Sequence, residues 1–88
     1  MDLEDYRREI DRVNAEIVDA VSRRMKTVEE VAAYKKQHDM QIKDEEREEK
    51  VKQQFEKLFS EEGLPKHKGR EMAELLIQTA VEKEEELV

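Results

Sequence analysis

The sequence predicts an all-α fold with three helices per chain, the first of which is very long. Apolar residues recur at steps of three and four along most of the chain, which is the spacing of one buried helical face. Gly and Pro, the two residues that most often interrupt helices, are absent before Gly63. Only 36% of the 88 residues are apolar and 47% are charged, so the core is thin, but the clear helical period argues against disorder. We therefore expect a single helical domain over residues 1–88.

The first predicted helix runs from about Leu3 to about Gln37, with Asp2 as its expected N-cap. A helix of about 35 residues is a rod of about 50 Å, whereas a compact chain of this size has a radius of gyration of about 12 Å. The rod would extend beyond a monomer and leave half of its apolar face in water. We therefore predict an intertwined homodimer with the two first helices as its spine, and a filament-like adaptor is the alternative. The apolar face carries Leu3, Tyr6, Ile10, Val13, Ile17, Ala20 or Val21, Val28 and Val31.

A short break is expected from His38 to Lys43, with Ile42 as an apolar anchor. Asp44 is a good N-cap for a second helix, because its side chain can accept a hydrogen bond from a free backbone N–H group. A loop from Ser60 to Lys66, which contains the turn-forming residues Gly and Pro, ends this helix. The inner side of the second helix is expected to carry Glu48, Val51, Phe55, Leu58 and Phe59.

The third helix is expected to start near Lys66 to Gly69 and to continue to about Leu87. No segment of the sequence is strand-like, and there are no internal repeats. The apolar pattern of this helix runs through Met72, Leu75, Leu76, Thr79, Ala80, Lys83 or Glu84, and Leu87.

Composition excludes several classes of function. The formal net charge of -7 makes nucleic acid and anionic membranes poor partners. There is no Cys, and the two histidines, His38 and His67, have no second ligand at metal-binding spacing, so we expect no metal site. The start of the sequence is acidic and has no apolar segment, so we expect no signal peptide. No apolar run approaches the length of a membrane span of about 18 residues. A soluble, cytoplasmic protein is the expectation.

Arg24 lies on the apolar face of the first helix, seven residues after Ile17 and seven before Val31. Lys35 continues the same face four residues further on. An unpaired buried charge costs several kcal/mol, so two cations on this face need a reason, and an anionic ligand is one. The two lie about 16 Å apart along the axis, which suits a ligand of small-metabolite size. The alternative is that Arg24 reaches out to water at the edge of the apolar face.

Arg7 is a third candidate cation, seventeen residues before Arg24 and therefore roughly 25 Å away along the helix. One small molecule cannot easily contact both residues of one helix, but Arg7 of an antiparallel partner chain could join Arg24. A guanidinium group suits a carboxylate because its planar fork gives two parallel hydrogen bonds. The alternative is that Arg7 is an ordinary surface charge.

The start of the second helix carries a mixed set of charges. Asp44, Arg47 and Glu48 fall on the same side as Val51 and Phe55, which faces the core. Glu48 is therefore expected to point inward as a hydrogen-bond acceptor beside Arg47. The alternative is a solvated helix start, where acidic residues are favoured by the helix dipole.

These residues together resemble the AroQ-class, all-helical chorismate mutases. The similarity covers nearly the whole chain and has no gaps in spacing. Each motif is weak alone, but four in register over some forty residues are fairly specific. The motifs are Tyr6-Arg7-Arg8-Glu9-Ile10-Asp11, Ser22-Arg23-Arg24-Met25, Ala33-Tyr34-Lys35 and Asp44-x-x-Arg47-Glu48.

The resemblance implies an interlocked helical homodimer with two equivalent sites, each taking Arg7 from one chain and its other residues from the second. The implied reaction is the Claisen rearrangement of chorismate to prephenate, on the route to Phe and Tyr, without a cofactor or covalent intermediate. Arg7 and Arg24 would bind the two carboxylates, and Lys35 would donate to a carboxylate and to the ether oxygen. Glu48, with the Asp44 region, would receive the ring hydroxyl, and Arg47 would add positive potential and orient these acids.

Two positions depart from the family pattern, which usually has a Ser and, four residues later, a Gln that donates to the ether oxygen. Ala80 and Glu84 stand there. Ala80 cannot make the hydrogen bond to the ring carboxylate, and Glu84 can donate only when it is a protonated, neutral acid. Alternatively, Glu84 is simply one residue of the acidic tail and has no role in the site.

Two alternative functions remain open for the whole chain. One is an isochorismate-pyruvate lyase on the same scaffold, and the other is a non-enzymatic helical dimerisation module.

Overall fold

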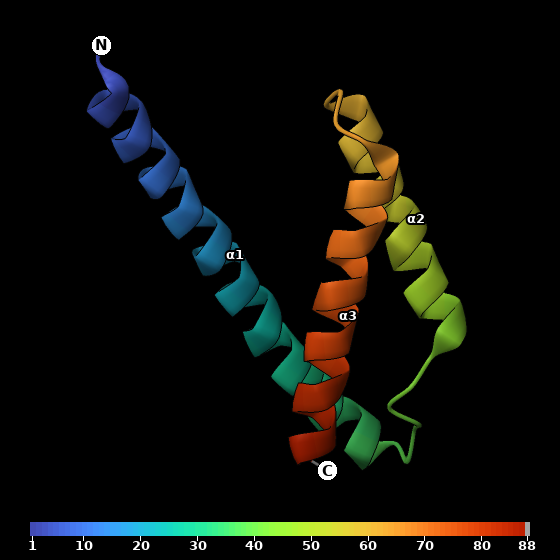
Figure 1. Ribbon diagram of the computed structural model, residues 1–88. Helices are drawn as coiled ribbons and strands as arrows, with labels where there is room; N and C mark the ends of the chain where they lie inside the picture. Colours follow the sequence, from blue (N-terminus) through green and yellow to red (C-terminus); the bar gives the residue numbers. More distant parts are fainter. Residues whose placement is uncertain (88) are drawn as a thin grey trace.

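A computed structural model of the chain describes residues 1–87, which form α1 (Leu3–Gln37), α2 (Glu45–Glu61) and α3 (Lys66–Leu87). Helices α2 and α3 pack side by side as an antiparallel hairpin, and the C-terminal part of α1 crosses the C-terminal part of α3 (Figure 1). The described residues contain no strand. Their Cα radius of gyration is 16.1 Å and their longest extent is 55 Å. The predicted all-α chain with a protruding first helix is confirmed.

Acidic N-caps fix the starts of α1 and α2, as predicted. The Asp2 side chain accepts from the backbone N–H of Asp5 at 2.9 Å, and the Asp5 side chain accepts from the backbone N–H of Asp2 at 3.0 Å. The Asp44 side chain accepts from the backbone N–H of Arg47 at 3.0 Å. Each cap satisfies a backbone donor that the first helical turn leaves without a partner.

The two connections turn the chain through left-handed backbone positions. Asp39 has φ 53° after the end of α1, and Gly63 has φ 73° between α2 and α3. Asp and Gly are among the residues that adopt this conformation most readily. The second connection is closed by a hydrogen bond from the backbone N–H of Leu64 to the carbonyl of Phe59 at 2.8 Å.

Small residues, rather than large apolar ones, bring α2 and α3 together. A Cβ atom added to Gly69 would lie 2.5 Å from the Phe55 carbonyl oxygen and 2.9 Å from the Phe59 ring, so only Gly fits at this approach. Ala73, one turn later, is fully buried. The prediction that Leu58 lies on the inner side of α2 is wrong, because its side chain is exposed. The large apolar residues Met72, Leu75 and Leu87 of α3 are exposed as well, since the two helices meet along Gly69 and Ala73.

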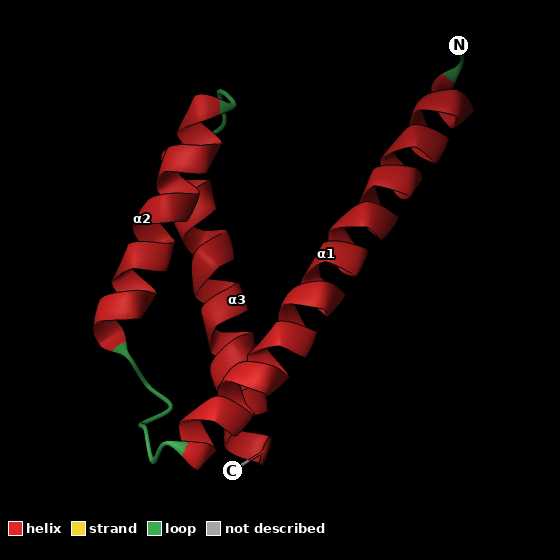
Figure 2. Cartoon of the chain, turned by 180° about the vertical axis from the view of Figure 1, so that it is seen from behind, coloured by secondary structure: helices red, strands yellow, loops and turns green. Residues whose placement is uncertain are grey.

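The N-terminal half of α1 has no packing partner within the described chain. The helix diverges from α3 as it runs back toward its N-terminus, so that the two helices form an open V (Figures 1 and 2). The apolar face is buried only near the crossing point, at Val28 and Ala32. Beyond it, the apolar side chains are between 42% and 60% exposed, at Leu3, Tyr6, Ile10, Val13 and Ile17.

A membrane-crossing helix is not among the three: none of the described helices combines the necessary length with sufficient apolar character.

Candidate active site

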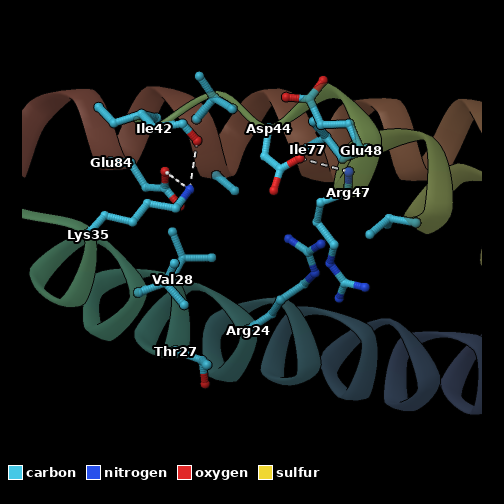
Figure 3. A pocket seen from close by; sticks show the side chains of 14 residues that line it. Arg24, Thr27, Val28, Lys35, Ile42, Asp44, Arg47, Glu48, Ile77 and Glu84 are labelled. Carbon is cyan, nitrogen blue, oxygen red and sulfur yellow. Dashed lines mark hydrogen bonds and ion pairs between the residues drawn. The ribbon is translucent and has the colours of Figure 1, made fainter. Parts of the chain in front are cut away.

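A cavity of about 350 Å³ opens where the C-terminal half of α1, the start of α2 and the C-terminal half of α3 face one another (Figure 3). Its lining combines apolar side chains with charged groups of both signs. The lining residues are Arg24, Thr27, Val28, Val31, Lys35, Ile42, Asp44, Arg47, Glu48, Val51, Ile77, Ala80, Val81 and Glu84.

Two guanidinium groups enter this cavity from opposite walls. The side chains of Arg24, from α1, and Arg47, from α2, converge in Figure 3. Neither forms an ion pair with any described residue; Arg24 Nη1 donates only to the Leu76 carbonyl, at 3.4 Å. Partial burial and, to a smaller extent, the positive charge of Arg47 lower the pKa of Arg24. Since the sequence holds 24 acidic residues, two converging cations without an acidic partner mark a place where an anion would be stabilised.

Lys35 is held at the other end of the cavity by two hydrogen bonds. Its Nζ donates to the Ile42 carbonyl at 2.6 Å and to Glu84 Oε2 at 3.2 Å (Figure 3). The side chain of Lys35 is 17% exposed and that of Glu84 is 8% exposed. An ammonium group has three N–H donors, so one remains for a ligand after these two bonds. The lysine is therefore fixed in position before any ligand arrives.

The start of α2 supplies the carboxylates on the remaining wall. Asp44 faces the cavity while its side chain caps the helix. Glu48 also lines the cavity, with 17% of its side chain exposed, and its two oxygens accept from Lys43 Nζ at 3.2 and 3.3 Å. The cavity thus carries cations for anionic groups and a carboxylate that can accept from a hydroxyl.

Seven of the eight predicted site residues line this cavity: Arg24, Lys35, Asp44, Arg47, Glu48, Ala80 and Glu84. Arg7 does not reach it from the same chain. It lies near the N-terminus of α1, 60% exposed, and its Nη1 contacts Glu4 at 2.6 Å. The roles predicted for these eight residues, including Arg7 of a partner chain, stay predictions.

Sequence reasoning missed the apolar part of the lining. Ile77 lies three residues before Ala80, and Val81 lies three residues before Glu84, so the helical period would have found both. Val28 and Val31 were placed on the apolar face of the first helix but not in the site. Lys43 was also missed, because no periodic pattern marks a loop residue that precedes an N-cap.

The lining residues, which come from all three helices, suit an anion of small-metabolite size that also carries a hydroxyl group. The family profile described as chorismate mutase type II matches residues 6–85, and the chain belongs to that family. The protein is accordingly an isomerase, a chorismate mutase, and its substrate is chorismate. Comparison with curated proteins and with solved structures found no match.

Proposed function

We propose that the cavity between the three helices catalyses the rearrangement of chorismate to prephenate by orienting the substrate and stabilising charge, without a cofactor. The observation that carries this proposal is the convergence of Arg24 and Arg47 without an acidic partner among the described residues. Chorismate carries two carboxylates, an ether bridge and a ring hydroxyl, and the charged groups around the cavity complement all three.

The reaction is intramolecular and balances without any co-reactant. The ether C–O bond breaks while a new C–C bond forms between the side chain and the ring, and no proton is transferred. Free chorismate rarely adopts the compact chair that this step needs. Arg24, together with Arg7 of a partner chain, binds the two carboxylates and holds the chair, which is an orientation effect.

Charge develops on the ether oxygen as its bond to the ring breaks. Lys35, with one N–H donor left after its bonds to Ile42 and Glu84, stabilises this charge from a fixed position. Glu84, when protonated, donates to the same oxygen. Lowering the barrier by about 8 kcal/mol corresponds to a rate gain of about a millionfold, and cations held in fixed positions can supply much of it.

The ring hydroxyl is received at the start of α2. Glu48 accepts it, Asp44 helps to shape this corner of the site, and Arg47 adds positive potential beside both. Ala80 leaves room on α3 where a hydrogen-bond donor to the ring carboxylate is missing, and a water molecule takes its place.

The active form in this proposal is a homodimer with shared sites, which acts in the cytoplasm on the route to Phe and Tyr. The exposed apolar face of α1 supports a dimer, because a second copy of α1 would cover it. Antiparallel pairing supports the shared site, since it brings Arg7 of one chain toward Arg24 of the other across the roughly 25 Å that separate them within a helix.

The test compares Arg24→Ala with Arg23→Ala. Arg23 is the adjacent residue, but its side chain is 72% exposed and contacts Asp19 at 3.1 Å, outside the cavity. We expect Arg24→Ala to lower kcat/KM for chorismate by at least about a hundredfold with the fold intact, and Arg23→Ala to stay within about twofold, as surface changes do. The loss of chorismate absorbance gives the rate, and product identification separates prephenate from released pyruvate. Absence of turnover by the folded wild-type protein, or full activity of Arg24→Ala, would overturn the proposal.

A further inference from the structure

We infer that Lys43 is a positioning residue that holds the Glu48 carboxylate in the orientation that receives the ring hydroxyl of the substrate. This inference rests on the proposed function. Lys43 Nζ lies 3.2 Å from one carboxylate oxygen of Glu48 and 3.3 Å from the other. These are the only hydrogen bonds that the Glu48 side chain makes with the described residues.

Glu48 needs such a tether because it stands between two spaces. One is the catalytic cavity, and the other is a neighbouring groove of about 290 Å³ between α2 and α3, which Glu48 also lines. A glutamate side chain has several freely rotating bonds, so an unrestrained carboxylate could turn toward either space. Arg47 does not restrain it, since its guanidinium makes no ion pair with Glu48 in the described structure.

The backbone around Lys43 is fixed on both sides. The carbonyl of Ile42 accepts from Lys35 Nζ at 2.6 Å, and Asp44 is locked as the N-cap of α2. Lys43 therefore starts from a fixed Cα atom between the active-site lysine and the helix that carries Glu48. The loop, the cap and the tether form one continuous support for this corner of the site.

The geometry leaves the carboxylate able to accept a further hydrogen bond. A carboxylate has about four lone-pair sites, and one ammonium group that approaches both oxygens occupies only one side of it. The other side remains for a hydroxyl donor in the cavity. The other charged residues that line the cavity are Arg24, Lys35, Asp44, Arg47 and Glu84. Lys43 lines only the groove, together with Lys52, Glu74, Glu82 and Glu85, so it reaches Glu48 from the groove side.

The ion pair between Lys43 and Glu48 contributes little to the stability of the fold. The Lys43 side chain is 61% exposed, and ion pairs in such exposed positions are weak. Substitution of Lys43 should therefore leave the fold intact, so that any change in turnover reports on the orientation of Glu48.

The experiment combines three variants with two substrates. Lys43→Gln removes the charge, Lys43→Arg keeps it, and Lys52→Gln removes a neighbouring charge that lines the same groove without bonding to Glu48. The substrates are chorismate and an analogue in which hydrogen replaces the ring hydroxyl. With chorismate we expect Lys43→Gln to lose about tenfold in kcat/KM, and Lys43→Arg and Lys52→Gln to stay close to wild type.

The analogue separates positioning from a general structural role. Without a hydroxyl to receive, the orientation of Glu48 no longer matters, so Lys43→Gln and the wild type should react with the analogue at equal rates. Equal losses with both substrates, or no loss with chorismate, would overturn the inference. Turnover of chorismate by the wild-type protein tests the proposed function separately.

Discussion

Arg24 illustrates how a residue that opposes folding can create a binding site. Its side chain is partly buried, its pKa is lowered by that burial and by Arg47, and no described carboxylate compensates its charge. The chain has 24 acidic residues and a net charge of -7, yet none of the described ones forms an ion pair with Arg24. The free energy that the chain forgoes at this position becomes available to an anionic substrate, because binding supplies the missing counter-charge.

Glu84 allows a direct test of which hydrogen bond it makes to the substrate. Its Oε2 accepts from Lys35, while its Oε1 makes no hydrogen bond with the described residues and remains for the ligand. An amide at this position donates a hydrogen bond, whereas a methyl group does not. If Glu84 donates to the ether oxygen, Glu84→Gln should keep kcat/KM for chorismate close to wild type, and Glu84→Ala should lower it by at least about tenfold. Full activity of Glu84→Ala would contradict this role of Glu84.

The helix boundaries could be predicted because local rules determine them. Asp2 and Asp44 are acidic N-caps in the sequence and in the structure, and the apolar period of α1 ends where the helix ends. The inner face of α3 could not be predicted in the same way. Periodicity arguments count large apolar residues, whereas the closest helix approach uses Gly69 and Ala73, which carry little apolar signal.

Some residues of the candidate site could likewise be predicted from the sequence, and others could not. Arg24 and Lys35 could be found because a charge on an apolar face conflicts with the pattern around it. Lys43 could not, since its importance depends on a contact with Glu48 across a turn, and an exposed loop lysine is an ordinary feature of any sequence. The predicted pairing of Arg7 with Arg24 of a second copy also depends on how two chains assemble, and the structure of one chain does not show this.

The α2–α3 hairpin should respond to acid through Arg70 of α3, which contacts Glu49 and Glu56 of α2 at 3.0 and 3.3 Å. The hydrogen bond from Arg70 is the largest of the effects that lower the pKa of Glu49 below its ordinary value of 4.5. A depressed pKa in the folded state stabilises the fold above the ordinary value, and this contribution disappears as pH falls through the folded-state pKa.

We therefore expect Glu49→Gln to lower the thermal midpoint by a few degrees at neutral pH, and the difference from wild type to close as pH falls through the lowered folded-state pKa of Glu49. Thermal unfolding followed by circular dichroism measures both midpoints across this range. Glu61→Gln on the same helix, where no ion pair is found among the described residues, is the control and should not lower the midpoint. A gap that persists in acid would assign the effect to packing rather than charge.

At the scale of the whole molecule, a site shared between chains predicts complementation. Homodimers of Arg7→Ala and of Arg24→Ala should each be inactive, because every site lacks one carboxylate-binding residue. After the two variants are unfolded together and refolded, about half of the dimers are mixed, and each mixed dimer has one complete site. Activity should then recover to about a quarter of the wild-type value.

Two outcomes of the mixing experiment would reject the shared site. If Arg7 plays no part in binding, Arg7→Ala is active without mixing. If Arg7 and Arg24 of the same chain serve one site, the mixture stays as inactive as its components. Each variant refolded alone is the control for losses during refolding.

The uncovered apolar face on the N-terminal half of α1 also sets how catalytic output depends on gene dosage. If that face is completed only by a second copy, dilute chains are inactive, and the number of sites rises as the square of chain concentration below the dissociation constant of the dimer. Halving the amount of chain would then cut output roughly fourfold in that range, and only about twofold once dimers predominate. A cell that makes little of this protein would have almost none of its activity, and a modest increase in synthesis would act as a switch.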